Sequence, residues 1–503
     1  MVGRDDDLAE ACRRTLGAAE RLITITGPVG VGKSRLTIAM AAALAEEDGL
    51  SVYVVDLATV VDRTGLAAAV IEHLGISTAT PPTLGGLGAA FPQTELLLVL
   101  DRCDQLRAEI AELATTVLAS SPRARVVVTS REPLHIYGEQ LLAVRPLPVP
   151  DVASDQTASE LLELPSVALF IQRLANVRPF FRLTDSNRGI VAELCAQLDG
   201  LPLAIEQAAA QLKVVQPQTL LSRLQESIEI LDGAANASPV HSASLPAALA
   251  DHVAELPPEA RALLTRLAVV NGEFRLQDVE AVADAPTGHA QHLLEVLVDR
   301  NLVEVCESAG DDLRLRLLHT TRTFVRGLPA ADREQTTRLY VDRLVADVTK
   351  RAGGHLEPLG GPAGSPAEQE DLSAGFAYLR RTGRAEDALR NAASLVPHFV
   401  ARGDCTQGLA GHRSVPAAPD PGDGREPTGT ALTARQREVA ELVSQGLTNR
   451  EIARRLGIAE WTAVNHVRHL LRKLQFTSRV QVARWVARQP AVNHPHPPAE
   501  SRS

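Results

Sequence analysis

Short apolar runs alternate with helix-like stretches over the first 150 residues of the chain. The runs do not alternate strictly with polar residues, which is typical of strands that are buried on both faces of a parallel sheet. Helix-like stretches such as residues 34–47 lie between them, so this rhythm predicts an α/β core. The predicted strands are residues 21–26, 52–57, 96–100 and 124–130.

Helical spacing of apolar residues dominates the remainder of the chain. Residues 245–335 end in two alternating segments, LVEVCES and LRLRLLHTT, and helices followed by a small hairpin predict a winged-helix-like subdomain. The predicted segments are an α/β core at 1–150, a helical subdomain at 151–240, a winged-helix-like subdomain at 241–335, a short helical segment at 336–410, a flexible Pro- and Gly-rich linker at 411–430, a four-helix unit at 431–489 and a disordered tail at 490–503.

The charge of the chain has opposite signs in two regions. The 503 residues carry a formal net charge of −10, but residues 431–489 hold eleven Lys and Arg against four Asp and Glu. That unit therefore carries +7, and the rest of the chain carries −17. A basic helical unit on an acidic body indicates a local binding site for a polyanion.

Cysteine usage and hydropathy limit the other classes of protein. The five cysteines are far apart and form no CxxC pair, so neither a disulfide framework nor a zinc site is expected. No apolar run reaches the roughly 18 residues needed to span a bilayer. The acidic start MVGRDDDLAE lacks the apolar stretch of a signal peptide, so we expect a cytoplasmic location and no membrane partner.

The sequence GPVGVGKS at residues 27–34 matches the phosphate-binding pattern GxxxxGK[ST]. It follows a predicted strand and opens a predicted helix, which is the context that separates this motif from an ordinary glycine-rich turn. Its three glycines allow the backbone to wrap a phosphate, and the N-terminus of the helix favours an anion. Lys33 is expected to reach the β- and γ-phosphates, and the Ser34 hydroxyl is expected to bind Mg²⁺.

Polar residues after two later predicted strands complete the candidate site. LLLVLD places Asp101 at the end of a strand, where it is expected to hold, through water, the Mg²⁺ that Ser34 also binds. Asp104 is a candidate for polarising the attacking water, or else a solvated acid at a helix start. Arg131 follows VVVTS and is a candidate for contacting the γ-phosphate, or else an ordinary surface arginine. The predicted catalytic set is Asp101, Asp104 and Arg131.

Five motifs in a fixed order extend this interpretation to about residue 400. They are VGR at residues 2–4, GPVGVGKS, LVLDRCDQL, VVVTSREPL and GLPLAIEQAAA at residues 200–210. Together they resemble the NB-ARC class of STAND ATPases, as found in bacterial regulators that join such an ATPase to a helix-turn-helix. The resemblance implies that the core is a P-loop NTPase and that its cofactors are ATP or ADP with Mg²⁺.

The resemblance also implies roles for individual residues. Gly3 and Arg4 would lie on the adenine side of the nucleotide, and Pro202 would pack against it from the helical subdomain. The implied nucleotide-binding set is Gly3, Arg4, Gly27, Gly30, Gly32, Lys33, Ser34, Arg35 and Pro202. Residues 316–324 resemble the winged-helix element that senses ADP, although Leu318 and His319 stand where the family often has a His–Asp pair or a Glu. Residues 370–404 resemble the first helices of a TPR-like array.

Residues 431–489 carry the sequence signals of a DNA-reading unit. Thr433 and Gln436, like Thr448 and Glu451, have the spacing of a capping box, which predicts two helix starts. A third helix is predicted at 460–474 and a fourth at 478–488. The apolar stripe of the third helix is Ala463, Val467, Leu470 and Leu474. Its exposed face carries Asn465, Arg468 and Arg472, which is typical of a recognition helix in the major groove.

This unit closely resembles the LuxR-type helix-turn-helix, which implies double-stranded promoter DNA as a partner. The implied DNA-binding set is Thr448, Asn449, Thr462, Val464, Asn465, Arg468, Arg472 and Lys473. Two departures from the family's pattern are Ala459, where an N-capping Ser is usual, and Val464, where a Lys or Arg commonly contacts DNA. The alternative is a four-helix module for protein interaction whose positive face is only solvated.

The sequence thus predicts a transcription regulator that ATP and ADP switch between two states. ATP would favour self-association and binding of two DNA half-sites, RNA polymerase is a further candidate partner, and any hydrolysis would be slow and would reset the switch. The alternative hypothesis is a STAND assembly ATPase whose terminal helical domain recruits a protein. A metabolic ATPase or kinase is disfavoured, since no motif for a substrate pocket accompanies the phosphate-binding loop.

Overall fold

In the computed structural model the chain forms two compact units, Met1–Arg343 and Leu344–Ser503. The residues that it describes are 1–353 without 18–19, 47–48, 76–82, 88–90, 92–93, 153, 155, 238–243, 284, 307–312 and 331; 374–384 without 376; 434–456 without 446 and 448; and Val467, Leu470, Val482 and Val486. The linker predicted at 411–430 and the tail at 490–503 lie outside the described residues, as does most of the TPR-like segment.

A five-stranded parallel sheet forms the core of the first unit, which confirms the predicted α/β class. Its strands are β1 (Leu22–Thr26), β2 (Ser51–Asp56), β3 (Leu96–Asp101), β4 (Ala124–Thr129) and β5 (Glu139–Ala143), in the order β2-β3-β4-β1-β5. The first four lie within a residue or so of the predicted runs. The prediction missed β5, an edge strand whose sequence EQLLA lacks the longer apolar run that marks the other strands.

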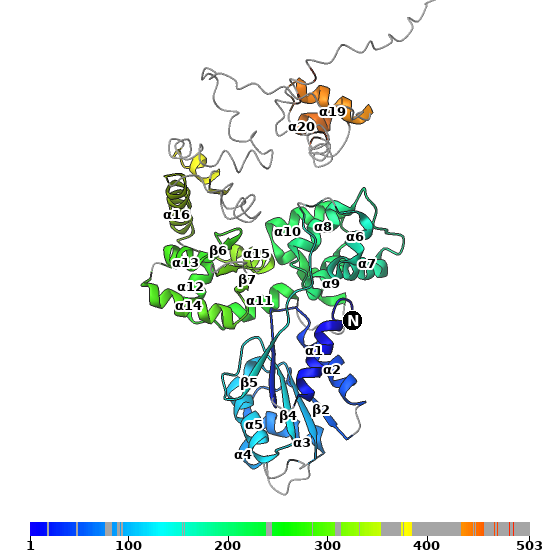
Figure 1. The fold of residues 1–503 in the computed structure, drawn as a ribbon, viewed down its shortest axis with the longest axis vertical. Coiled ribbons are helices and arrows are strands. Elements are labelled where there is room, and N and C mark those ends of the chain that lie inside the picture. The colour runs from blue at the N-terminus through cyan, green and yellow to red at the C-terminus, as the bar shows by residue number, and fades with distance from the viewer. Residues whose placement is uncertain are drawn as a thin grey trace, which may run out of the picture. The chain divides into compact units, whose positions relative to one another are not determined.

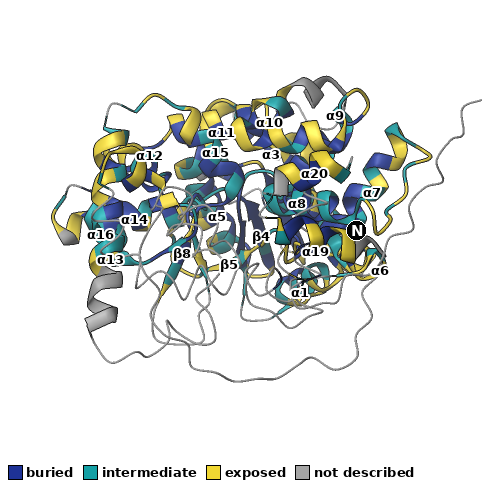
Figure 2. Ribbon diagram, turned by 90° about the horizontal axis from the view of Figure 1, so that it is seen from above, coloured by how far each residue is buried: buried dark blue, intermediate teal, exposed yellow. Residues whose placement is uncertain are grey.

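Alternate residues of each central strand face opposite sides of the sheet, and both sides are covered. On one side, Leu97 and Val99 of β3 pack with α1 (Asp5–Leu16) and α2 (Lys33–Leu44). On the other side, Leu98 and Leu100 pack with helices that contribute a separate cluster. These helices are α3 (Arg63–Leu74), α4 (Leu84–Leu87) and α5 (Arg107–Ser120), with the turn η2 (Asp104–Leu106) before α5. Figure 2 shows the resulting buried strands beneath helices with exposed outer surfaces.

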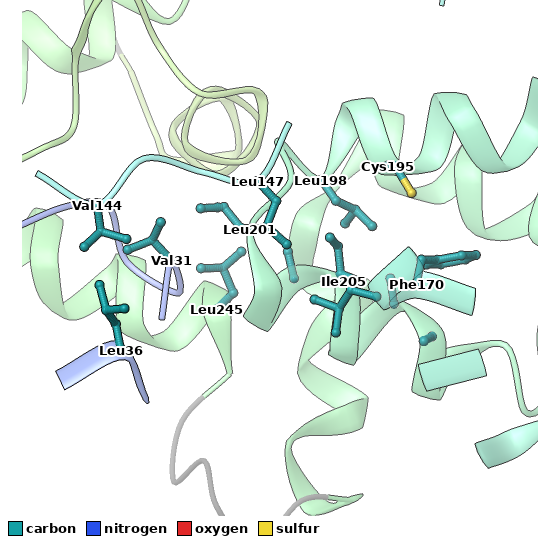
Figure 3. Packing of buried hydrophobic residues seen from close by; sticks show 14 of the residues in the cluster. Val31, Leu36, Val144, Leu147, Phe170, Cys195, Leu198, Leu201, Ile205 and Leu245 are labelled. Atoms are coloured by element: carbon teal, nitrogen blue, oxygen red, sulfur yellow. The ribbon is translucent and has the colours of Figure 1, made fainter. Parts of the chain in front are cut away.

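A helical segment continues the core of the sheet. It comprises α6 (Ala158–Glu163), α7 (Pro165–Val177), α8 (Arg188–Gln197), α9 (Pro202–Gln211), α10 (Pro217–Glu226) and the 3₁₀ segment η3 (Ile228–Ala237). Phe170 and Ile205 of this segment belong to the same buried cluster as Val31 and Leu36 beside the sheet (Figure 3). Gly200 is required at the junction, because its φ is +64° and a Cβ there would lie 2.0 Å from the carbonyl oxygen of Leu147.

The next segment has the predicted helices followed by a hairpin. It comprises α11 (Leu245–Ala254), α12 (Pro258–Leu267), β6 (Glu273–Phe274), α13 (Leu276–Ala283), α14 (Thr287–Asp299), β7 (Glu304–Cys306), β8 (Arg314–Arg316) and α15 (His319–Gly327). β8 pairs antiparallel with both β7 and β6. The strands β6 and β7 are labelled among the helices of this segment in Figure 1. Asp199, before α9, accepts hydrogen bonds from the backbone N–H of His319 (2.9 Å) and of Thr320 (2.7 Å) and so caps α15.

The described residues of the last segments are helical. They include α16 (Arg333–Gly353), α19 (Ala434–Ser444) and α20 (Asn449–Leu456). Val467 and Leu470 are buried with Val439 and Ile452 in one cluster, which confirms that these two residues of the predicted third helix face its core. Val482, from the predicted fourth helix, belongs to the same cluster.

Candidate phosphate-binding site and DNA-binding module

The phosphate-binding loop lies between β1 and α2 and depends on its glycines. Gly27, Gly30 and Gly32 have φ values of +149°, +80° and +100°, which residues with a side chain rarely adopt. A Cβ on Gly27 would lie 2.5 Å from the carbonyl oxygen of Val144, and one on Gly30 would lie 2.9 Å from the Cβ of Leu203. Gly32 has open space and precedes the first turn of α2, so there the backbone angle alone demands glycine.

Lys33 is the first residue of α2, and its ammonium group lies against the loop. Its Nζ donates hydrogen bonds to the carbonyl oxygens of Gly27 (2.8 Å) and Pro28 (3.1 Å). Desolvation lowers the pKa of Lys33 to about 8, although the negative charges of Asp104 and Asp101 oppose this shift while the positive charge of Arg131 adds to it. The predicted catalytic residues therefore act electrostatically on the predicted phosphate-binding lysine.

The two residues after Lys33 have different environments. Ser34 is half-buried, and its hydroxyl belongs to the first turn of α2. Arg35 is largely exposed, and its guanidinium lies 3.6 Å from the carboxylate of Glu206 on α9. In this structure Arg35 thus links the start of α2 to the helical segment.

Asp101 is the buried last residue of β3, as predicted. Its carboxylate accepts a hydrogen bond from the Thr129 hydroxyl at the end of β4, and Thr129 in turn accepts one from the backbone N–H of Arg102 at 2.8 Å. Because β4 lies between β3 and β1, Thr129 bridges the acid to the strand that carries the loop. A carboxylate and the Ser34 hydroxyl are oxygen donors of the kind that Mg²⁺ prefers.

Asp104 and Arg131 form a pair at the same edge of the sheet. The backbone N–H of Arg131 donates to Asp104 Oδ1 at 2.7 Å, and the guanidinium Nε lies 3.3 Å from Asp104 Oδ2. The side chain of Arg131 is only 14% exposed, so it is not an ordinary surface arginine. Its Nη2 also donates to Glu255, which directly follows α11, at 3.1 Å.

The residues that the family resemblance places near adenine have structural partners. Gly3 packs on the start of α7, where a Cβ would lie 2.2 Å from the Cβ of Pro165. The buried guanidinium of Arg4 donates to Asp7 (2.6 Å) and to the backbone carbonyl oxygens of Arg145 (2.8 Å) and Val31 (3.1 Å). Arg4 therefore fastens the first helix to the loop, and contact with adenine remains a prediction.

Pro202 begins α9, but its neighbour Leu203 contacts the loop. The backbone N–H of Leu203 donates to the carbonyl oxygen of Gly30 at 3.1 Å. Leu245 also reaches this place, since its side chain would lie 3.3 Å from a Cβ on Gly30. Figure 3 shows Leu245 beside Leu201 and Val31. Sequence reasoning missed Leu203 and Leu245, because ordinary leucines in amphipathic helices carry no sign of this contact.

Three further residues that sequence reasoning missed come from the winged-helix segment. His252 lies in the last turn of α11, Glu255 directly follows α11, and Arg300 directly follows α14. His252 is 1% exposed, and desolvation with the positive charges of Arg131, Lys33 and Arg300 lowers its pKa to about 2. Arg300 pairs with Glu132 at 3.3 Å, and the Asn301 side chain donates to the carbonyl oxygen of Arg131 at 2.7 Å. The winged-helix segment therefore meets the predicted phosphate site.

Most of the predicted DNA-binding set lies outside the described residues: Thr448, Thr462, Val464, Asn465, Arg468, Arg472 and Lys473. Asn449 is the first residue of α20, and Arg454 and Arg455 are exposed in its last turn. The recognition face therefore remains a prediction, while the core beneath it is observed.

Two further kinds of feature are absent from the described residues. No group of three or more His, Cys, Asp or Glu side chains within the described part of the chain is arranged to hold a metal ion. Among the helices that the structure describes, none is both long and apolar enough to cross a membrane. Cys103, Cys195 and Cys306 form no disulfide among the residues that the structure describes.

Two family models match parts of the chain. A model for bacterial regulatory proteins of the LuxR family matches residues 430–486, and a model for a winged helix-turn-helix domain matches residues 256–330. The nitrate/nitrite response regulator protein NarL of Escherichia coli K12 is 51% identical over 55 residues, which are 11% of this chain and 26% of NarL. The C-terminal helical unit is thus a LuxR-type helix-turn-helix.

Longer similarities connect the chain to mycobacterial proteins. Rv0890c of Mycobacterium tuberculosis, provisionally named an HTH-type transcriptional regulator, is 32% identical over 410 residues, covering 80% of this chain and 44% of Rv0890c. The uncharacterized protein Rv0894 of the same organism is 33% identical over 334 residues, covering 64% of this chain and 80% of Rv0894. The chain therefore spans less than half the length of the named regulator but most of Rv0894.

Among solved structures, the chain is similar to a STAND protein with a tetratricopeptide repeat sensor from Pyrococcus horikoshii. The TM-score is 0.27 at 15% identity, with 80% of this chain and 50% of that chain covered.

Proposed function

The chain belongs to the family of the mycobacterial protein Rv0894 and carries a LuxR-type helix-turn-helix at residues 430–486, and from this premise we propose that it is a DNA-binding transcription regulator switched by ATP and ADP. The switch would be the P-loop core of the STAND type, and the output would be binding of promoter DNA. Hydrolysis, where it occurs, would be slow and would reset the switch.

The observation that carries this proposal is the link between Arg131 and the winged-helix segment. Arg131 is the candidate for contacting the γ-phosphate, and here its guanidinium is shared between Asp104 at the sheet and Glu255 at the end of α11. A γ-phosphate would compete with Glu255 for the same guanidinium, because both are anions. ATP binding would therefore weaken a contact that holds the two segments together, whereas ADP would leave it intact.

The loop itself offers what a nucleotide needs. Three glycines with positive φ leave the backbone free to surround a phosphate, and Lys33 stands at the N-terminus of α2. The Ser34 hydroxyl and the Asp101 carboxylate would hold Mg²⁺, which would neutralise charge on the phosphates when bound. Asp104 would orient water. The hydrogen bond that it accepts from the backbone N–H of Arg131 holds it at the edge of the sheet where β3 and β4 end.

The consequence for DNA binding is a shift between two populations. A closed form with ADP would keep chains apart, and an open form with ATP would let them associate and place two helix-turn-helix units on neighbouring half-sites. RNA polymerase is a candidate partner of the bound form. The buried Val467 and Leu470 support a packed helix beneath the predicted recognition face.

The test is the mass of the full-length chain by light scattering, with Mg²⁺ and either ADP or a non-hydrolysable ATP analogue. We expect a larger particle only with the analogue. Lys33→Ala should abolish both nucleotide binding and assembly, whereas Lys213→Ala, which changes an exposed lysine on the helical segment, should alter neither.

Assembly of the Lys33→Ala variant with the analogue would reject the nucleotide switch. The DNA-binding output is tested separately by the salt dependence of binding to duplex DNA, which should weaken steeply as salt rises because phosphate contacts release counterions. Absence of DNA binding by the assembled form would instead favour recruitment of a protein.

A further inference from the structure

His252 lies on the buried stripe of α11. Leu245, Leu249 and His252 follow one another at helical spacing and are all buried, with exposed fractions of 0%, 3% and 1%. Leu245, at one end of this stripe, lies against Gly30 of the loop, and Glu255, just past the other end, bonds to Arg131. Helix α11 therefore extends from the phosphate-binding loop to the end of β4, with His252 between these two contacts.

Neither ring nitrogen of His252 has a hydrogen-bond partner among the residues that the structure describes. Buried polar atoms are nearly always paired, and leaving one unpaired costs stability. A buried imidazole without a partner is therefore a place where a ligand can supply the missing acceptor.

The charged groups that act on His252 come from three elements and are all cations. They are Lys33 at the start of α2, Arg131 after β4 and Arg300 after α14. This convergence is unfavourable for a protonated imidazole in the empty protein, and it lowers the pKa of His252 beyond the effect of burial. The same convergence attracts a polyanion, which would compete with the carboxylates that now pair with Arg131 and Arg300.

We propose that His252 directly contacts a terminal phosphate of the nucleotide held by the loop, so that the winged-helix segment supplies one of the phosphate ligands. This inference rests on the proposed function of the loop and adds a ligand that neither the loop motif nor the strand ends contain. The nucleotide would then connect α11 to the loop through His252. This connection would add to the existing contact between Leu245 of α11 and Gly30 of the loop.

His319 is the other candidate histidine of this segment, and its surroundings differ. It lies in the element that resembles the ADP sensor, but the cations that act on it, Arg322 and Arg326, belong to its own helix α15. Lys33 is not among the groups that lower its pKa. In addition, His319 Nδ1 lies 3.5 Å from the Thr323 hydroxyl on its own helix, whereas both ring nitrogens of His252 lack a partner among the described residues. The geometry therefore assigns the phosphate contact to His252 and not to His319.

The proposal predicts opposite effects of one substitution on two properties. His252→Phe keeps a planar ring of similar size and removes both nitrogens. The nucleotide-free variant should unfold at a higher temperature, because the unpaired polar atoms are gone. Its affinity for polyphosphates should fall, because a charge-assisted hydrogen bond is lost.

The experiment measures dissociation constants of full-length protein for AMP, ADP and a non-hydrolysable ATP analogue by calorimetry. For His252→Phe we expect affinity to fall roughly tenfold or more for ADP, the ATP analogue or both, and to stay unchanged for AMP. Loss for ADP and the analogue identifies the β-phosphate, and loss for the analogue alone identifies the γ-phosphate. His252→Gln, which keeps an N–H donor, should recover most of the affinity.

The matched control is His135→Phe, because His135 is 57% exposed and lies 3.6 Å from Asp299 at the contact between the same two segments. It should leave all three affinities unchanged. Equal affinities of the wild type and His252→Phe, or an equal loss for AMP, would overturn the phosphate contact. Failure of the underlying function is distinguishable, since the wild type and Lys33→Ala would then bind all three nucleotides equally poorly.

Discussion

The phosphate-binding loop and helix α11 meet at the proposed nucleotide site, but the sequence encodes them differently. The loop concentrates its glycines and Lys33 in eight consecutive residues whose spacing is itself informative. Helix α11 and the residue after it contribute Leu245, His252 and Glu255 from more than 200 residues away, and none of them stands out from an ordinary amphipathic helix and its end.

This difference shows that a sequence motif reveals the groups that would hold the phosphate and does not reveal the groups that would respond to it. The groups that would hold a phosphate must sit close together on one loop, so they leave a local pattern. The groups that respond to the phosphate lie on a different segment, and only the folded chain brings them to the loop. Substitutions on each side therefore test whether the two regions act as one site.

The largest effect is expected at Gly200, where the helical segment meets the sheet. Gly200→Ala introduces a Cβ 2.0 Å from the Leu147 carbonyl oxygen at a φ of +64°, which should lower the free energy of unfolding by about 4 kcal/mol. The control is Gly288→Ala on α14, where a Cβ meets nothing within 4 Å. That variant should gain about 0.5–1 kcal/mol, since alanine favours helix. Chemical denaturation measures the stability of both variants. Equal stabilities of Gly200→Ala and the wild type would contradict the close approach of Gly200 to Leu147.

The next effect concerns the contact between α11 and the loop. Leu245 is fully buried in the cluster that contains Val31 and Leu201, so Leu245→Ala should cost about 3 kcal/mol of stability. Because Leu245 also packs on Gly30, the variant should bind ADP more weakly than the wild type at a temperature where both are folded. An unchanged affinity for ADP despite the loss of stability would show that the packing of α11 on the loop does not affect nucleotide binding.

Acid should destabilise the nucleotide-free protein through His252. The pKa of its ring is about 2 in the folded chain and about 6.5 in the unfolded chain, so the unfolded chain binds the proton more readily. Stability from this group is complete above pH 6.5 and falls by about 2 kcal/mol between pH 6.5 and pH 5. His319, whose pKa is lowered to about 4, acts in the same direction. Urea unfolding midpoints at pH 7.5, 6 and 5 should fall less for His252→Phe than for His135→Phe, and parallel falls would contradict the prediction.

The smallest effect on stability is expected at Glu255. Glu255→Gln removes a 42% exposed carboxylate from Arg131, which should change the free energy of unfolding by less than about 1 kcal/mol. The concentration of ATP analogue needed for half-maximal assembly should nevertheless fall about twofold to fivefold, since Arg131 is released from a competing anion. Glu259→Gln, which alters a 70% exposed carboxylate paired with His289, is the control. If Glu255→Gln needed more ATP analogue than the wild type for half-maximal assembly, the proposed competition between Glu255 and the γ-phosphate would be contradicted.

The sequence predicted features that a local pattern determines. Strands β1, β3 and β4 were predicted because they are apolar on both faces, and β2 was predicted from its apolar run although it is an edge strand. The strand-end position of Asp101 followed directly. Val467 and Leu470 were assigned to a buried stripe by helical spacing alone. The edge strand β5 and the contacts of Leu203, Leu245 and His252 could not be predicted, because exposure and packing against distant residues leave no periodic signal.

The hydrogen bond from Leu203 to Gly30 has a consequence for synthesis of the chain. A ribosome delivers residues in order at roughly 5–20 per second, so the loop emerges on the order of ten to thirty seconds before helix α9 can hold its carbonyl oxygen. During that interval the nascent chain contains the loop's sequence without its anchor, and Leu245 and His252 emerge later still. Tight nucleotide capture would therefore begin only after about half of the chain has left the ribosome, which delays any ligand-assisted folding of the core.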